Sequence, residues 1–196
     1  MKNIAVLCTS LSAAAFRDCF EGIRECAIAE NSNVFFFGSD RMVQTDGRYE
    51  TGECNVFNIT DYRDFDGAIL LSNTFVDLKV EEELVKKLEE SGIPTVSIEG
   101  NYPSMYNFRI DNRKAMYEMV HHFIQVHGFK RINFVTGPMN SLEARDRHKG
   151  YVDAMNDYGI EFSREQIYEG DYLPHSGYLA AEYFLNQDGP MPEAIV

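Results

Sequence analysis

The chain alternates short, continuously apolar runs with stretches whose apolar residues recur at helical spacing, and this alternation limits the folds that it can adopt. The runs IAVLC (4–8), VFFFG (34–38) and DGAILLS (66–72) are each long enough for one strand. Because successive residues in these runs are apolar, we expect both faces of each strand to be covered, as in parallel sheets. The sequence therefore predicts an α/β fold in which helices cover parallel sheets on both faces.

The same alternation continues along the rest of the chain. Further strands are predicted at 93–99, 131–137, 167–171 and 193–196. Helices are predicted from a cap at Ser12 to Ala27, and at 78–90, from Asp111 or Asn112 to 127, 141–158 and 176–186. Gly92, Gly128 and Gly159 are placed to end three of these helices. The segment 39–65 is poorly periodic and receives no firm assignment.

A segment with glycine and proline, GNYPSMYNF near 100–108, separates two series of strands and helices. Such a segment is typical of a connection between compact units. We therefore predict two Rossmann-like lobes, residues 1–103 and 104–196.

Composition excludes several classes of partner. Lysine and arginine number 18 and aspartate and glutamate 31, so the formal charge is 18 − 31 = −13. An acidic surface repels phosphate backbones, so we expect no direct binding of nucleic acid by this segment. The apolar runs are far shorter than the roughly 20 residues of a membrane span, and no signal peptide precedes the first strand. These features predict a cytoplasmic protein without a membrane partner.

Cysteines and histidines give no sign of a disulfide or a metal centre. No CxxC pair occurs, and Cys19 and Cys26 lie seven residues apart on one face of a predicted helix, so we expect reduced, buried thiols. His122 and His127 are five residues apart, which does not place them on one helix face. No metal site is predicted.

Catalytic motifs are absent from the sequence as well. We find no GxGxxG, GxxxxGK[ST], GxSxG or HExxH pattern. We therefore predict that this segment is not an enzyme, and that it has no catalytic residues and no cofactor. A small flavodoxin-like enzyme remains as an alternative, because Thr9 to Ser12 form a hydroxyl-rich turn after the first strand.

Polar residues follow the predicted strands, at the edge where open parallel sheets bind ligands. Hydroxyls, amides, carboxylates, arginine and an aromatic ring suit a neutral polyhydroxylated ligand, or one with a single anionic group. The predicted ligand-binding residues are Ser10, Ser12, Phe16, Ser72, Asn73, Glu99, Asp111, Arg147 and Tyr172.

Three long segments follow one another in a distinctive order: RIDNRKAMYEMVHHFIQVHGFKRINFVTGP, SLEARDRHKGYVDAMNDYGI and IYEGDYLPHSGYLAAEYFL. Together they resemble the regulatory domain of the lac/gal repressor family, which is built like a type I periplasmic sugar-binding protein. The resemblance is strong over 66–196 and weaker over 1–65. It implies two lobes with a small-molecule effector, a sugar or a nucleoside-like compound, held between them.

The resemblance also assigns roles to particular residues. It implies that Arg147, three residues before a Gly-aromatic pair, contacts the effector and that Tyr172 lines the pocket. Glu99 falls where the family more often has Asp, and Asp111 and Ser10 fall on further pocket positions. The family's Asn/Ser-Pro-Phe-Phe turn is replaced here by LSAAAF, which ends in Phe16, so specific contacts of that turn are lost.

Each of these residues also has a structural interpretation, which the sequence leaves open. Arg147 can pair with Glu143 or Asp146 on the outside of its helix, and Tyr172 can pack at the lobe interface. Glu99 and Asp111 suit helix caps or hinges, and Ser10, Ser12 and Asn73 suit ordinary turns and caps.

The family continues beyond the AIV at which this sequence stops, so we expect a fragment in which both lobes are incomplete and the C-terminal part is truncated. Such a fragment should leave apolar surface uncovered, which a second copy could cover. The family also has a helix-turn-helix before the regulatory domain, which is not in this sequence.

The main functional hypothesis is a sensor domain whose lobes close on a small molecule and pass the signal to a C-terminal module. The segment GECNVFNITDYRDFDGAILLSNTF resembles the sensor part of proteins that carry a GGDEF diguanylate cyclase. The alternative is the effector-binding domain of a lac/gal-type transcription regulator. We expect a homodimer, and a dimerisation platform that has lost ligand binding is a further alternative.

Overall fold

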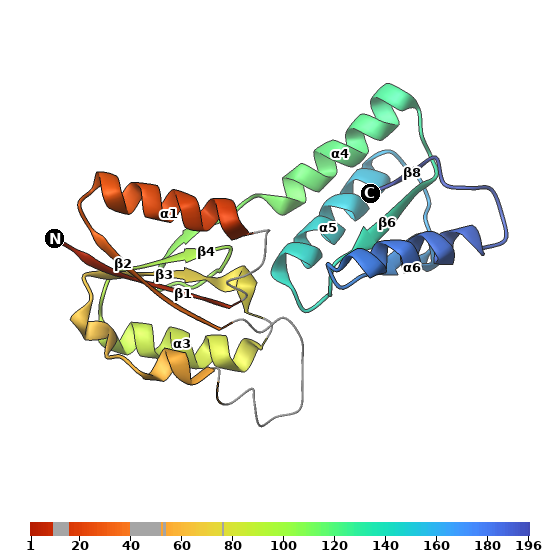
Figure 1. Ribbon diagram of the computed structural model, residues 1–196. Helices are drawn as coiled ribbons and strands as arrows, with labels where there is room; N and C mark the ends of the chain where they lie inside the picture. The colour runs from red at the N-terminus through yellow and green to blue at the C-terminus, as the bar shows by residue number, and fades with distance from the viewer. Residues whose placement is uncertain (10–15, 40–51, 53, 76) are drawn as a thin grey trace. The chain divides into compact units, whose positions relative to one another are not determined.

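The computed structural model describes residues 1–9, 16–39, 52, 54–75 and 77–196, which form two compact units, Met1–Arg109 and Ile110–Val196 (Figure 1). The division between the two units falls after Arg109. Strand β5 (Tyr106–Phe108) belongs to the first unit, because it pairs with β4 (Thr95–Ile98).

The first unit is built on a five-stranded sheet whose described strand pairs are all parallel, as the continuous apolar runs predicted. Its strand order is β2-β1-β3-β4-β5. The remaining strands are β1 (Asn3–Thr9), β2 (Asn33–Ser39) and β3 (Gly67–Leu71). The part of 39–65 that is described contains two short 3-10 helices, η2 (Asn55–Asn58) and η3 (Tyr62–Asp64).

Helices cover this sheet on its two faces: α1 (Arg17–Ala29) lies on one side and α3 (Leu78–Ser91) on the other (Figure 1). Ala5 and Leu7 of β1 belong to the apolar cluster that includes α3, η2 and η3. Val6 and Cys8 belong to the cluster on the α1 side. Alternate residues of β1 therefore enter different cores, which explains why the strand is apolar at every position.

The second unit has a three-stranded parallel sheet of order β7-β6-β8. Around it, α4 and α5 pack against each other, and α6 lies on the other side of β6 from α5 (Figure 1). The strands are β6 (Ile132–Thr136), β7 (Ile167–Glu169) and β8 (Ala194–Ile195), with a short 3-10 helix η5 (Arg164–Gln166) before β7. The helices are α4 (Asn112–His127), α5 (Leu142–Asp157) and α6 (Pro174–Leu185).

Most predicted helix ends agree with the structure within two residues. The side chains of Asp77, Asp111 and Ser141 accept hydrogen bonds from the first turns of α3, α4 and α5. Gly92 and Gly128 adopt the left-handed conformation that ends α3 and α4. The predicted cap at Ser12 lies outside the described residues, and α1 begins at Arg17.

The prediction of buried thiols was wrong for Cys26. Cys8 is buried in the sheet and Cys19 and Cys54 are partly buried, but Cys26 is exposed, and the four cysteines form no disulfide within the described part of the chain. Helix α1 contains no buried residue, because its C-terminal half lies beside a groove at the amino ends of the strands rather than under a second layer. Seven-residue spacing places Cys26 on the same face as Cys19, but Cys26 lies at the groove, where that face is open.

Buried ionisable groups predict how stability depends on alkaline pH. Burial raises the pKa of the Cys8 thiol from 9.0 to about 12, with the nearby Cys19 as a second cause. Burial likewise raises the pKa values of the Tyr62 and Tyr151 hydroxyls. The unfolded chain therefore releases these protons first as pH rises, so the free energy of unfolding falls above about pH 9.

Between the pKa of a buried group in the unfolded chain and its higher pKa in the folded chain, that group lowers the free energy of unfolding by up to about 1.4 kcal/mol per pH unit. Urea unfolding followed by circular dichroism between about pH 8 and pH 10.5 measures the slope. The variant Cys8→Ala should have a smaller slope, because the thiol's contribution is removed. Stability that stays constant over this range would contradict the prediction.

Among the helices of the described residues, none combines the length and apolar character needed to cross a bilayer.

Candidate functional site

A small cavity lies within the second unit at the carboxyl ends of β6 and β7, beside the start of α6. Its volume is about 220 Å³. It is lined by Met116, Phe134, Val135, Thr136, Gly137, Arg147, Gly170, Tyr172, Leu173, Ser176, Gly177 and Val196. Ligands of open parallel sheets bind beyond the carboxyl ends of the strands. In this unit a cavity lies at that edge of the sheet.

Tyr172 occupies one wall of this cavity in a strained backbone conformation. Its φ of +65° lies in the left-handed region, which costs a non-glycine residue on the order of 1 kcal/mol. Its ring lies directly over Gly137, where an added Cβ would approach the Tyr172 Cζ to 2.0 Å. Gly137 therefore leaves the space that the ring fills, and strain at a residue in a cavity is typical of functional positions.

Arg147 contacts the tyrosine from α5. One Nη donates a hydrogen bond of 3.2 Å to the Tyr172 hydroxyl, and the guanidinium carbon lies 5.4 Å from the ring centroid. The Ser141 hydroxyl lies 3.2 Å from the same Tyr172 oxygen. The structure thus brings together Arg147 and Tyr172, two of the predicted site residues that are 25 positions apart in the chain.

Two hydrogen bonds connect Arg147 to Tyr172 and to the main chain of its own helix. Its Nε donates to the main-chain oxygen of Glu143 at 3.3 Å, while the Glu143 carboxylate accepts from the Ser141 hydroxyl at 2.6 Å. The Asp146 carboxylate pairs with Lys149 at 3.5 Å. The guanidinium is thereby held at the cavity with donors on the Tyr172 side.

The loop between β7 and α6 is fixed by its own hydrogen bonds. The Asp171 carboxylate accepts from the Leu173 main-chain N–H at 2.9 Å, and the Asp171 N–H donates to Ser176 at 3.2 Å. The Leu173 bond, followed by Ser176 and the His175 imidazole at 3.1 Å, lowers the pKa of Asp171. These bonds hold Tyr172 between two anchored neighbours.

In the first unit, strand ends also carry polar residues. Ser72 and Asn73 lie in a short 3-10 turn, η4 (Ser72–Thr74), directly after β3. The Thr9 N–H donates to the Thr74 hydroxyl at 2.9 Å, so the ends of β1 and β3 are joined. Ser72 is buried, with its Oγ 3.1 Å from the Ser97 Oγ, whereas Asn73 is exposed.

Glu99 follows β4 and is buried, with a left-handed φ of +61°. Its N–H donates to the main-chain oxygen of Phe108 at 2.8 Å, so the residue also turns the chain beside β5. Next to it, Gly100 lies so close to Ser97 and Ser72 that an added Cβ would clash with both hydroxyls. The left-handed φ at this buried residue costs a non-glycine residue on the order of 1 kcal/mol.

The other predicted residues have different surroundings. The Asp111 carboxylate accepts from the Lys114 N–H at 2.9 Å and caps α4, which fits the structural interpretation of this residue. Phe16 is partly buried and directly precedes α1, while Ser10 and Ser12 lie outside the described residues.

Sequence reasoning missed some of the residues that shape the second-unit cavity. Gly137, which accommodates the tyrosine ring, and Thr136 are the last residues of the β6 run and its turn. Ser176 lies in the first turn of α6. These positions have small side chains that carried no chemical signal. Ser141, which caps α5, lies in the stretch 141–147 that the strand-end rule selects, but it was not among the residues predicted to bind the ligand.

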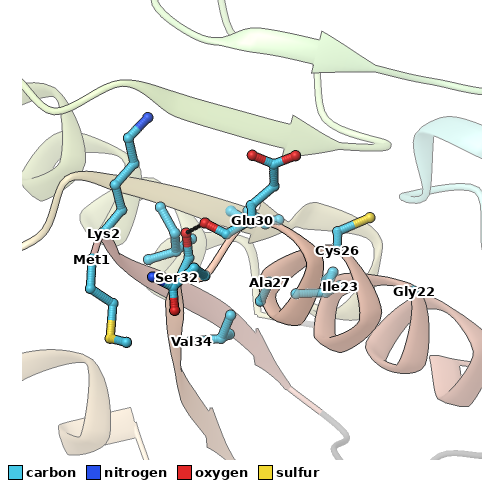
Figure 2. Close-up of a pocket in the computed structure, with 12 residues that line it drawn as sticks. Met1, Lys2, Gly22, Ile23, Cys26, Ala27, Glu30, Ser32 and Val34 are labelled. Atoms are coloured by element: carbon cyan, nitrogen blue, oxygen red, sulfur yellow. Dashed lines mark hydrogen bonds between the residues drawn. The ribbon is translucent and has the colours of Figure 1, made fainter.

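A larger groove lies in the first unit, with a volume of about 620 Å³ (Figure 2). Its walls come from the C-terminal half of α1, including Ile23 and Cys26, and from the amino ends of β1 and β2, including Ile4 and Val34. It lies at the opposite end of the strands from the edge at which parallel sheets bind ligands, and its lining is mainly apolar. We therefore place the candidate site at the carboxyl ends of the strands and not in this groove.

Known proteins share both the sequence pattern and this fold. The family model described as periplasmic binding proteins and sugar binding domain of LacI family matches residues 2–196. The HTH-type transcriptional regulator RegA of Clostridium saccharobutylicum is 26% identical over 190 residues, 94% of this chain and 52% of its own length. Catabolite control protein A of Priestia megaterium is 28% identical over 192 residues, 95% of this chain and 53% of its own length.

A solved structure agrees in fold. The LacI family transcriptional regulator from Mycobacterium smegmatis superposes with a TM-score of 0.74 at 20% identity, covering 98% of this chain and 66% of that chain. The chain spans about half the length of the two sequence relatives named above. Because the family model matches nearly every residue, the chain belongs to the family of periplasmic binding proteins and LacI-type sugar-binding domains.

Proposed function

We propose that this chain is the effector-binding domain of a LacI-family transcription regulator and that Arg147 and Tyr172 contact the effector. The main support for the proposal is the contact between Arg147 and Tyr172 at the carboxyl ends of β6 and β7. The second support is that the chain belongs to this family. Effector binding would signal by favouring one conformation of the protein over another through a difference in affinity.

The chemistry of the cavity favours a neutral, hydroxyl-rich effector such as a sugar or a nucleoside. The Tyr172 ring offers an apolar face for a sugar ring or a base, and Arg147 offers paired donors for vicinal hydroxyls. Ser72, Asn73 and Glu99 are proposed as further contacts, because they lie at the carboxyl ends of β3 and β4. Asp111 is a weaker candidate, since its carboxylate already caps α4.

The output of the whole protein is proposed from its relatives. RegA is named as a transcriptional regulator, and the Mycobacterium smegmatis protein likewise, whereas no observation favours the diguanylate cyclase that the segment 52–75 suggested. We therefore prefer the transcription regulator to the cyclase and propose that DNA is bound by another part of a dimeric, cytoplasmic protein. Reading the gene on both sides of this segment tests the choice: a helix-turn-helix frame upstream supports it, and a GGDEF frame downstream contradicts it.

An experiment on the chain itself tests the effector site. Thermal unfolding is measured with a panel of sugars and nucleosides, and a compound present at 100 times its Kd should add about 2.7 kcal/mol of stability. The variant Arg147→Ala should lose this stabilisation, because it removes the donors at the cavity. Lys149→Ala is the matched control, since Lys149 lies on the same helix but pairs with Asp146.

Three outcomes count against the proposal. Stabilisation that persists in Arg147→Ala moves the site elsewhere. Stabilisation by no compound of the panel favours a dimerisation platform that has lost ligand binding. Turnover of a compound, or a flavin spectrum in the purified protein, favours the flavodoxin-like enzyme.

A further inference from the structure

We propose that His122 and His127 form a two-ligand binding site for a divalent transition metal ion of the Cu²⁺, Ni²⁺ and Zn²⁺ group. Their Nε2 atoms face each other at 3.1 Å, with ring centroids 4.9 Å apart. This inference is independent of the effector site, because both histidines lie at the C-terminal end of α4, away from the cavity-lining residues.

Residues five apart do not share a face of a regular helix, so the spacing of His122 and His127 predicts no shared metal ion. The structure removes that objection, since His127 is the last residue of α4 and Gly128 leaves the helix with a φ of +71°. At a helix end the side chain of His127 can turn back over the preceding turn. The two imidazoles therefore meet although their positions in the sequence predict that they do not.

The distance between the two nitrogens matches the bite of a metal ion. Zinc–nitrogen bonds are about 2.0–2.1 Å long, so two imidazole nitrogens on one ion are about 2.9 Å apart at a right angle and about 3.3 Å apart at the tetrahedral angle. The observed 3.1 Å lies between these values. The ion would replace the hydrogen bond between the rings. The ring that donates this bond through Nε2 would then carry its proton on Nδ1, which frees the Nε2 lone pair for the metal.

Aromatic neighbours hold the His127 ring in the required position. It stacks on Phe129 at 5.3 Å between centroids, and Phe129 stacks in turn on Phe123 at 5.9 Å. The Phe129 N–H also donates to the main-chain oxygen of Phe123 at 3.2 Å, which fixes the turn after α4. A histidine side chain that is already oriented loses little conformational freedom when it binds a metal ion. This pair should therefore bind a metal ion more tightly than two mobile surface histidines.

Imidazole ligands determine which ions fit. They suit Cu²⁺, Ni²⁺ and Zn²⁺, and affinity should follow the order Mn²⁺ < Co²⁺ < Ni²⁺ < Cu²⁺, with Zn²⁺ below Cu²⁺. No group of three or more His, Cys, Asp or Glu in the described part of the chain is arranged to hold a metal. The pair therefore supplies two ligands, and because both residues are exposed, water completes the coordination.

Titration of the chain with Zn²⁺ by calorimetry and with Cu²⁺ by electron paramagnetic resonance tests the site. We expect one bound ion, with two imidazole nitrogens coupled to Cu²⁺. Because outer-shell changes alone weaken metal binding by about 10- to 100-fold, His122→Gln and His127→Gln should each weaken it at least about tenfold. Both residues are exposed, so the folded state of the variants, checked by circular dichroism, should be retained.

Two other histidines serve as controls. The His121 Nδ1 lies 2.7 Å from the Tyr158 hydroxyl, and His175 pairs with Asp171 at 3.1 Å, so His121→Gln and His175→Gln should leave affinity unchanged. The proposal fails if His122→Gln and His127→Gln bind Zn²⁺ as tightly as the parent chain. It also fails if Cu²⁺ shows a single coupled imidazole, or if His175→Gln causes the loss, since the ion then lies elsewhere.

Discussion

Replacing Gly150 with alanine should destabilise the second unit, although alanine is the better helix former. An added Cβ would lie 2.2 Å from the main-chain oxygen of Arg113 and 3.1 Å from the Met116 Cβ, so α5 would have to move away from α4. The main chain of α4 cannot move aside as a flexible side chain can. Overpacking of this kind lowers the free energy of unfolding by about 3 kcal/mol. The better helix propensity of alanine offsets about 1 kcal/mol, which leaves a net loss of about 2 kcal/mol.

Movement of the two helices is further resisted by polar contacts along their length. The Arg113 Nε donates to the Asp153 carboxylate at 2.6 Å, and the Tyr117 hydroxyl donates to the Asp157 carboxylate at 2.9 Å. A shift of α5 would stretch both bonds, so relaxation does not remove the cost of the methyl group. Urea unfolding measures the loss, with the midpoint expected to fall and the slope to remain unchanged.

Gly177→Ala is the matched control for this prediction. Gly177 lies inside a helix of the same unit, and a Cβ there would meet nothing within 4 Å. Alanine at this position should therefore leave stability unchanged or raise it by up to about 1 kcal/mol. If Gly150→Ala is as stable as Gly177→Ala, the close packing of α4 on α5 is not as the structure has it.

Replacing Gly137 with alanine should impair effector binding while leaving stability nearly unchanged. A Cβ at Gly137 would lie 2.0 to 2.3 Å from the Tyr172 Cζ, Cε1 and hydroxyl oxygen. These atoms are the far end of a side chain, so the ring would move instead of the main chain. Its displacement breaks the hydrogen bonds to Arg147 and Ser141, and we expect a loss of affinity of about tenfold or more, or about 1.4 kcal/mol.

A double-mutant cycle separates displacement of the ring from other effects of the methyl group. If Gly137→Ala acts only through Tyr172, it should cause no further loss of affinity in a Tyr172→Ala background. Calorimetry with the effector found in the panel of sugars and nucleosides gives the four affinities. Additive losses in the double variant would mean that Gly137 contacts the effector directly, and wild-type affinity in Gly137→Ala would show that the ring position is unimportant.

The candidate site was only partly predictable from the sequence. Arg147 and Tyr172 were selected from the resemblance and from the strand-end rule, and the structure brings them within hydrogen-bond distance. Gly137 was not selected, because its role is to be small beneath a ring that is 35 residues away in the sequence. Asp111 was selected for its position, but its carboxylate caps α4, a competing role that sequence spacing also allowed.

The contact between His122 and His127 does not follow from their spacing in the sequence. Spacing rules assume that a helix continues regularly through both residues. Here α4 ends at His127, so the ring is free to turn toward His122, and stacking on Phe129 determines where it rests. Gly128, which ends the helix, and Phe129, which stacks on His127, are both visible in the sequence. Their effect on the direction of the His127 side chain depends on the packing around them.

The sequence by itself determined the α/β class, the parallel strands and most helix ends. Continuous apolar strands require two covered faces, and Asp77, Ser141, Gly92 and Gly128 act on their own helices through local hydrogen bonds and backbone angles. Only the tertiary structure decided which side chains meet. The contacts of Tyr172 with Gly137 and of Gly150 with Arg113, and the exposure of Cys26, depend on how elements pack, and packing distances of a few ångströms leave no periodic signal in a sequence.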